Sequence, residues 1–244
     1  MMNTDGGSPM HRVDAFWAAE LGIDPTRLRA ESWREVESPA ASDPAGLRVL
    51  AVPEATILSY TRGIRTRLAE AGFDAAALRR SPRENLSLLH RSANLLVRGP
   101  AWLGYWLSGT PPEPGIDAAP FAAVERHRLH HLQATDPAGW EEAGVTDAGL
   151  IFGVERDSML AAVAGYEPWH SDIAHLQVFC HPGHRGTGAA DAALREAVRH
   201  ALERGLIPQY RAADRNPASR RLAERLGFME YGWMAVVRLR NRLP

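Results

Sequence analysis

The chain has 244 residues, of which 45% are hydrophobic and 23% are charged, a composition typical of soluble globular proteins and unlike that of a disordered chain. No apolar run approaches the ~20 residues of a membrane-spanning helix, and the N-terminal stretch has no apolar core of the signal-peptide kind. The single cysteine, Cys180, excludes an internal disulfide and a zinc site made of cysteines alone. We therefore expect a cytoplasmic protein without a membrane partner.

Charge is unevenly spread along the chain, although the net charge is only −1. Residues 180–244 hold twelve Arg and six Asp plus Glu, a balance of +6. Such asymmetry can mark an anionic ligand, and solvated helix faces explain it equally well. No aromatic platform is interleaved with the Arg-rich stretch, so we expect no nucleic-acid partner.

The first 114 residues are predicted to form a mixed α/β unit. The apolar patterns predict helices over 13–21 and 54–71 and strands over 47–52 and 93–97, the last followed by a turn at "RGPAWLGYW". Residues 108–120, "SGTPPEPGIDAAP", contain four prolines and two glycines, which favour an extended spacer. A boundary near 115 therefore separates units 1–114 and 115–244.

The second unit shows sharper patterns. A helix is predicted over 121–134, a hairpin of strands 150–154 and 159–166 across "ERDS", and a strand over 173–180. After the glycines at 183–188 come a helix ending at Gly205, a strand over 206–212, a helix over 216–226 and a strand over 233–239. Because two helices each lie between strands, part of the sheet should be parallel.

The glycines Gly186 and Gly188 lie where a strand gives way to a helix N-terminus. The first N–H groups of a helix lack internal partners and sit at the positive end of its dipole. With Arg185 beside them, they suit a phosphate group, although a purely structural turn is an equal alternative. The segment is neither a nucleotide P-loop, because the Lys-Ser/Thr is absent, nor a dinucleotide motif, because Asp191 replaces the third glycine.

Two segments carry a resemblance to a known family. "HPGHRGTGAA" resembles the acetyl-coenzyme A-binding loop of the GNAT superfamily of N-acetyltransferases, whose pattern is Arg or Gln, two residues, Gly, one residue, then Gly or Ala; Arg185, Gly188 and Ala190 fill it. "NPASRRLAERLGF", residues 216–228, is similar to the family's Asn-led helix that ends in Leu-Gly-Phe. The N-terminal half looks like a degenerate copy of the same fold that lacks the glycine loop.

The resemblance implies an α/β (α+β) fold with a mixed, partly parallel sheet, whose two central strands splay apart around acetyl-CoA and whose faces are flanked by helices. We expect no metal, because the nearby His127, His130 and His131 have no Cys or ordered carboxylate spacing beside them and fit a solvated helix face. For Asn216, a role as a helix cap without any cofactor contact is an equal alternative. The residues that the resemblance assigns to the cofactor are Val178, Cys180, Arg185, Gly186, Thr187, Gly188, Ala189, Ala190, Asn216 and Ser219.

The resemblance further implies direct transfer of an acetyl group to a primary amine, with the N–H of Val178 facing the thioester carbonyl. Many family members carry a tyrosine acid seven residues after the Asn, and Ala223 stands there in this chain. Tyr231 is the substitute acid that we expect, and Glu141 or Glu142 the group that relays the amine proton. Four further residues border the strand over 173–180 and are alternatives for the base, with surface or capping roles favoured over catalysis: Glu167, His170, Asp172 and His175.

Two classes of function remain open on the sequence. The first is an acetyl-CoA-dependent N-acetyltransferase whose acceptor amine is unidentified. The second is a non-catalytic acyl-CoA-binding module used for sensing or docking, an alternative kept open by Ala223. A homodimer is left open as well.

Overall fold

The computed structural model describes residues 7–38, 46–114, 129–145 and 150–240. Their contacts separate the chain into two compact units. The first comprises residues 1–104, 211–220 and 230–244, and the second comprises residues 105–210 and 221–229. The units are interleaved along the sequence. The predicted boundary near residue 115 falls at the edge of a segment outside the described residues and stays a prediction.

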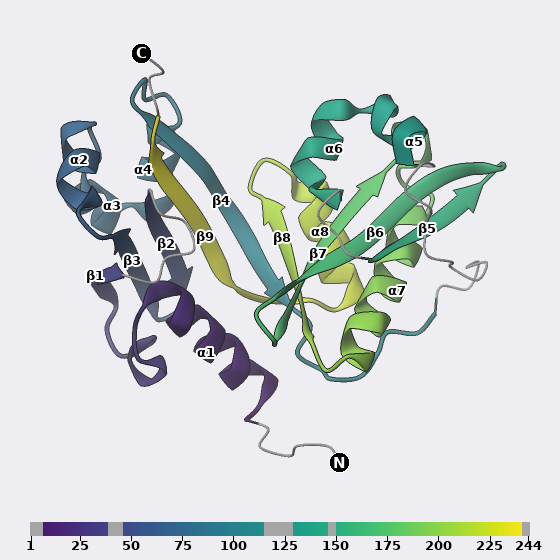
Figure 1. Ribbon diagram of the computed structural model, residues 1–244, viewed down its shortest axis with the longest axis horizontal. Coiled ribbons are helices and arrows are strands. Elements are labelled where there is room, and N and C mark those ends of the chain that lie inside the picture. Colours follow the sequence, from purple (N-terminus) through teal and green to yellow (C-terminus); the bar gives the residue numbers. More distant parts are fainter. Residues whose placement is uncertain (1–6, 39–45, 115–128, 146–149, 241–244) are drawn as a thin grey trace. The chain divides into compact units, whose positions relative to one another are not determined.

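The first unit is built on five strands in the order β1-β3-β2-β9-β4 (Figure 1). Their bounds are β1 Trp33–Ser38, β2 Gly46–Val52, β3 Ala55–Thr61, β4 Leu95–Tyr105 and β9 Met229–Leu239. Strand β1 runs parallel to β3, whereas β2 is antiparallel to both β3 and β9. Mixed pairing of this kind confirms the predicted fold class for this half of the chain.

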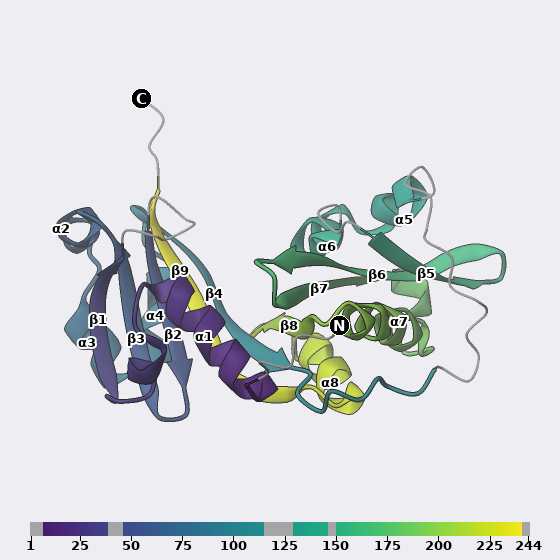
Figure 2. The same ribbon diagram turned by 60° about the horizontal axis from the view of Figure 1, so that its bottom comes forward.

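Helices cover both faces of these strands (Figure 2). Helix α1, Pro9–Leu21, followed by the 3-10 turn η1, Pro25–Arg27, lies on one face. Helices α2 Ile64–Glu70, α3 Ala75–Arg80 and α4 Pro82–Leu89 lie on the other. The second face holds an apolar cluster in which Leu68, Leu78 and Leu86 of the three helices join Val49 and Leu58 of the strands.

Two predictions for this unit were wrong. The segment 54–71 is a strand and then a helix, because Gly63 takes a left-handed conformation at φ 71° between them. Ile57, Leu58 and Tyr60 are buried within β3, where β-branched and aromatic side chains pack well. The stretch "RGPAWLGYW" continues the strand predicted at 93–97 through Tyr105 and makes no turn before it.

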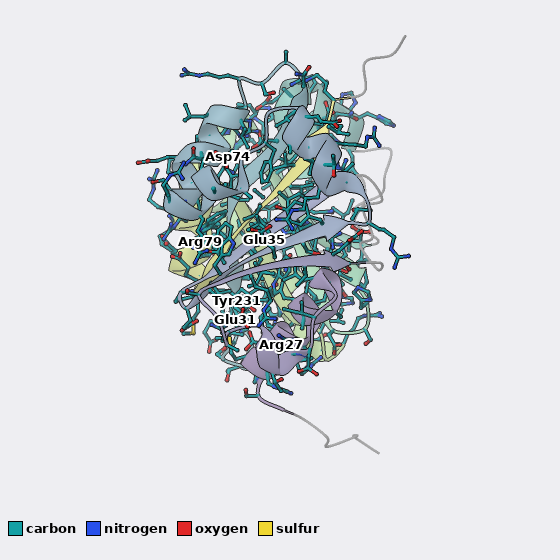
Figure 3. The ribbon with its side chains drawn as sticks, turned by 90° about the vertical axis from the view of Figure 1, so that its left-hand side faces the viewer. Arg27, Glu31, Glu35, Asp74, Arg79 and Tyr231 are labelled. Atoms are coloured by element: carbon teal, nitrogen blue, oxygen red, sulfur yellow. The ribbon has the colours of Figure 1, made fainter. Side chains whose placement is uncertain are left out.

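A partly buried polar cluster joins α1 to β9, and its β9 member, Tyr231, is labelled in Figure 3. The hydroxyl of Tyr231, a residue only 2% exposed, donates to Asp14 Oδ1 over 2.8 Å. Arg29 donates to both oxygens of the same carboxylate, from Nε at 3.1 Å and Nη2 at 3.0 Å, and its guanidinium lies 5.3 Å from the centre of the Tyr231 ring. The hydrogen bond to Asp14 raises the pKa of Arg29 above its usual range. The cluster therefore holds three distant segments of the first unit together.

The second unit has four strands in the order β8-β7-β6-β5. They are β5 Leu150–Arg156, β6 Met159–Trp169, β7 Ile173–Cys180 and β8 Ile207–Ala213. Strands β5, β6 and β7 pair antiparallel, and β7 pairs parallel with β8. The predicted hairpin, the strand over 173–180 and the parallel pairing are confirmed. Pro208 is the second residue of β8, near the start of the strand as expected.

Strand β7 is covered on both faces (Figure 2). Helix α7, Ala189–Glu203, packs on one face of β5, β6 and β7. Helices α5 Leu129–Thr135 and α6 Pro137–Ala143 lie on the other, where the ring of Trp140 meets Phe179 edge-on at 5.2 Å between centroids. The first part of the helix predicted over 121–134 lies outside the described residues. Helix α8, Pro217–Leu226, ends one residue before Gly227, as predicted.

Within the described part of the chain, no helix combines the length and the apolar character needed to cross a membrane.

We expect Tyr231→Phe to lower the free energy of unfolding by about 1.5 kcal/mol, since hydrogen bonds to charged groups contribute about 1.5–3 kcal/mol and Arg29 still pairs Asp14 in the variant. Chemical denaturation measures the change. Tyr60→Phe is a matched control, because the Tyr60 hydroxyl lies 3.4 Å from Glu35, at the limit of a hydrogen bond. Equal losses in the two variants would show that the Asp14 contact adds no stability.

Candidate functional site

The glycine turn between β7 and α7 has a conformation that requires glycine. After Cys180 the chain forms a short 3-10 turn, Pro182–His184, and reaches Gly186 at φ 81° and Gly188 at φ 85°. Both angles are left-handed, a region that other residues enter only with strain. A Cβ added at either position would meet no atom within 4 Å. The glycines are therefore set by backbone conformation, and the space beside them is open to a ligand.

The N-terminus of α7 carries no side-chain cap. Gly188 occupies the N-cap position, and no side chain bonds to the first turn there. The neighbouring Thr187 hydroxyl donates instead to the carbonyl of His184, over 2.7 Å. The N–H groups at this end of a 15-residue helix thus present the positive end of its dipole to an anion.

Arg185 connects the glycine turn to helix α6. Its Nη2 lies 2.9 Å from Oδ2 of Asp136, while Oδ1 of the same carboxylate accepts the N–H of Gly139 over 3.0 Å and caps α6. The Gly139 N–H, and then Arg185, hold the pKa of Asp136 below its usual range. The sequence reasoning missed Asp136, although an Asp directly before a Pro at a helix start is a recognisable cap signal.

Strands β7 and β8 are paired over only three positions, Ile173–His175 against Ile207–Gln209. The N–H of His181 bonds to Ala161 of β6, and the carbonyl of Asp172 accepts from Ile207 of β8. Backbone groups alternate along a strand, so the even-numbered residues of β7 point toward the β8 side. Val178 and Cys180 therefore present their N–H and C=O groups where the pairing with β8 has ended.

Cys180 is a half-buried residue at the end of β7. Burial raises the pKa of its thiol, against the opposing effects of Arg185 and of a hydrogen bond from the Ala190 backbone. A raised pKa keeps the sulfur protonated near neutral pH, and a thiol is a weak nucleophile. This environment does not favour Cys180 as a covalent catalyst.

The second unit brings most of the predicted cofactor residues together: Val178, Cys180 and 185–190 follow one another around the end of β7 and the start of α7. Asn216 and Ser219 belong by their contacts to the first unit, where Asn216 Oδ1 accepts the N–H of Ser219 over 3.1 Å and caps α8. Capping by Asn216 is confirmed. A cofactor contact by either residue stays a prediction.

The predicted catalytic residues have different surroundings. Glu141 and Glu142 are exposed on α6, and Tyr231 belongs to the first unit, bonded to Asp14. Ala223, at the position of the expected tyrosine, is fully buried. The roles of Tyr231, Glu141 and Glu142 stay predictions.

Sequence reasoning favoured a surface or capping role over catalysis for His175 and missed a polar row on the α6-facing side of β7. The His175 ring stacks on Trp169 at 4.2 Å between centroids, and its Nδ1 lies 3.2 Å from Oε1 of Gln209, whose amide bonds in turn to the Tyr105 hydroxyl. Gln177 is 5% exposed, and no donor among the described residues reaches its Oε1. Polar residues inside a strand with a long apolar pattern are the signal that could have revealed this row.

Comparison with known proteins finds a family model that matches part of the chain. The profile of the acetyltransferase (GNAT) family matches residues 118–228. Residues 118–228 are thus similar to a GNAT acetyltransferase domain. Proteins of this fold use acetyl-CoA as co-substrate, and the family as a whole carries out acyl transfer. No group of three metal-ligating side chains that could hold an ion occurs in the described residues.

Solved structures match this chain at low identity. A GNAT-family acetyltransferase from Novosphingobium aromaticivorans is 23% identical over 61% of this chain and 69% of its own, with a TM-score of 0.48. A GCN5-related N-acetyltransferase-like protein from Streptococcus suis is 15% identical over 75% of this chain and 70% of its own, at 0.45. A Drosophila protein is 12% identical over 68% of this chain and 58% of its own, at 0.50. At such identities the likeness concerns the fold alone.

The comparison with curated proteins gave no match.

We predict that Asp136→Asn lowers the thermal midpoint at pH 7, because asparagine can cap α6 but cannot pair with Arg185. A carboxylate whose pKa is lowered by folding stabilises the protein above its unfolded pKa, near 3.9, and loses that effect as the pH falls through the lower folded value. The difference between variant and parent should therefore shrink below about pH 4. Thermal unfolding at several pH values measures it, and a pH-independent difference would contradict the ion-pair interpretation.

Proposed function

We propose that the protein transfers the acetyl group of acetyl-CoA to a primary amine by direct attack. The observation that carries the proposal is the uncapped N-terminus of α7, with two left-handed glycines beside open space, at the end of a strand whose pairing with β8 stops early. A phosphate-binding helix terminus next to free backbone groups suits a ligand that has both a pyrophosphate and an amide-containing arm.

In this proposal the pyrophosphate of acetyl-CoA lies on residues 185–190, with the first N–H groups of α7 as donors. Arg185 supplies a positive charge and would divide its hydrogen bonds between the phosphate and Asp136. The amide arm of the cofactor runs along β7 and bonds to the backbone of Cys180. The N–H of Val178 faces the thioester carbonyl and stabilises the oxyanion that forms there.

The chemistry requires few side chains. The amine must lose a proton before it attacks the carbonyl carbon, and the CoA thiolate must leave with a proton or against a stabilising dipole. Exposed Glu141 and Glu142 on α6 are our candidates for relaying the amine proton. Tyr231 is the candidate acid, although its hydroxyl proton is engaged by Asp14 in this structure.

The buried alanine at position 223 favours a second candidate function, a non-catalytic acyl-CoA-binding module. The two functions differ in one measurement. Incubation with acetyl-CoA and a panel of primary amines releases free CoA thiol only if the protein is an enzyme, and the appearance of thiol without acetylated amine would indicate hydrolysis.

Gly188→Glu should abolish CoA binding, because a carboxylate then occupies the phosphate position and repels the phosphate charge. Isothermal titration calorimetry with CoA measures the loss. Gly205→Glu is a matched control at the other end of α7, since Gly205 also has a left-handed φ, 73°, and no atom within 4 Å of an added Cβ. If both variants bind CoA as the parent does, the phosphate site lies elsewhere.

Glu142→Gln and Tyr231→Phe are each expected to lower turnover at least ~10-fold while leaving CoA affinity unchanged, since general acid–base groups contribute ~10²–10⁴-fold in rate. Initial rates of thiol release at saturating acetyl-CoA give the comparison, with Glu203→Gln on α7 as a charge-matched control. Parental rates in both variants would mean that catalysis depends on positioning and on the Val178 amide.

A further inference from the structure

We infer that Asp136 is an internal competitor for the cofactor, an inference that rests on the proposed binding of CoA at residues 185–190. In the free protein its carboxylate holds the Arg185 guanidinium, and a phosphate of CoA must draw Arg185 away from it. Both side chains belong to the second unit, Arg185 on the glycine turn and Asp136 at the start of α6. Asp136 therefore lowers the affinity for the cofactor without touching it.

The guanidinium of Arg185 has one acceptor among the described residues. Its Nη2 donates to Asp136 Oδ2 over 2.9 Å, and no other side chain or carbonyl in the described part of the chain accepts from it. An arginine has five N–H donors, so most of the donors of Arg185 are left to solvent. The side chain is 59% exposed, and it can turn toward an anion on the glycine turn without unpacking the protein.

The carboxylate of Asp136, in contrast, is fixed. Its Oδ1 accepts the N–H of Gly139 over 3.0 Å and caps α6, and Pro137 follows as the first helical residue. A Cβ at position 139 would come within 2.6 Å of Asp136 Oδ2, so the glycine leaves the space that the carboxylate occupies. Arg185 is thus the movable member of the pair, and the carboxylate keeps its place when Arg185 leaves.

The charges around the turn explain why Asp136 opposes a bound anion. Paired with Asp136, Arg185 adds no net charge, and the positive end of the α7 dipole is then the main attraction for a phosphate. The carboxylate in the first turn of α7, Asp191, is paired with Arg195 of the same helix and is balanced in the same way. When a phosphate takes Arg185, Asp136 keeps only its cap N–H and lies one guanidinium away from a second anion.

Removing the carboxylate should therefore strengthen cofactor binding. Ion pairs in contact with solvent are worth up to a factor of about 5 in an equilibrium constant, and repulsion between Asp136 and the phosphate acts in the same direction. By linkage, CoA weakens the Arg185–Asp136 contact by the same factor by which that contact weakens CoA binding. The factor should be equal for CoA and acetyl-CoA, because both carry the same phosphates. Asp136 thus favours the release of CoA after transfer.

Isothermal titration calorimetry of the full chain with CoA measures the effect. Asp136→Asn should bind CoA about 2–5-fold more tightly than the parent, since asparagine still caps α6 but offers Arg185 no opposite charge. Arg185→Gln should bind CoA more weakly, and adding Asp136→Asn to it should gain less than Asp136→Asn gains alone. Glu203→Gln, at the other end of α7, is the charge-matched control and should bind as the parent does.

Stability and affinity should move in opposite directions. Loss of the ion pair lowers the thermal midpoint of the free Asp136→Asn protein and, for the same reason, raises its affinity for CoA. A residue that only supports the fold would lower both when it is changed. Asp136→Ser is a second variant, which keeps a capping hydroxyl and removes the charge, and it should also bind CoA more tightly.

The outcomes separate this inference from the proposed function. If the parent binds CoA and folded Asp136→Asn or Asp136→Ser binds it equally or more weakly, Asp136 is no competitor and the inference is overturned. Parental affinity in Arg185→Gln would overturn it as well, because Arg185 would then make no contact with a phosphate. A gain of the same size in Glu203→Gln would assign the effect to net charge and not to Asp136. If the parent itself does not bind CoA, both the inference and the proposed function fail.

Discussion

The early end of the β7–β8 pairing is the constraint on which the rest of the site depends. A strand that loses a neighbour must find other partners for its backbone groups, because unpaired buried amides are costly. Strand β7 can tolerate the loss because β6 pairs with it along all eight residues, while α7 covers one face and α6 approaches the other. The backbone N–H and C=O groups of Val178 and Cys180 all point toward the β8 side. A fixed strand with one free edge is thus available to an amide-containing ligand.

The glycine turn and the Arg185–Asp136 pair extend this arrangement from the strand to two helices. The turn brings the N-terminus of α7 to the free end of β7, and the ion pair ties the same turn to the cap of α6. Arg185 is exposed and Asp136 is partly exposed, and ion pairs in contact with solvent are weak. The pair is therefore suited to exchange, and an anion at the turn can compete for Arg185 at little cost. An anion that binds Arg185 at the turn therefore also changes the hydrogen-bond partner of Asp136, the N-cap residue of α6.

The sequence predicted the second unit better than the first for a physical reason. Around Gly186, Gly188 and Gly227, local chemistry decides the structure: each position sets a turn or a helix end, whatever packs against it. Within residues 54–71 the local signals conflict, since the apolar residues fit a helix and a strand equally well. Pairing of β3 with both β1 and β2 resolved the conflict, and that information is not local. Likewise Asp14, Arg29 and Tyr231 meet across 217 residues of sequence, beyond any motif.

Two glutamines illustrate which part of a site a sequence cannot reveal. Gln177 and Gln209 are both buried, and both lie in strands made mostly of apolar residues. Gln209 bonds to Tyr105 and His175 and so fixes its neighbours, whereas no donor among the described residues reaches the carbonyl of Gln177. A satisfied buried amide serves the fold, and an unsatisfied one weakens it unless a ligand restores the hydrogen bond. A buried glutamine is therefore distinguished by whether its side-chain amide has a hydrogen-bond partner, and only the three-dimensional structure shows this.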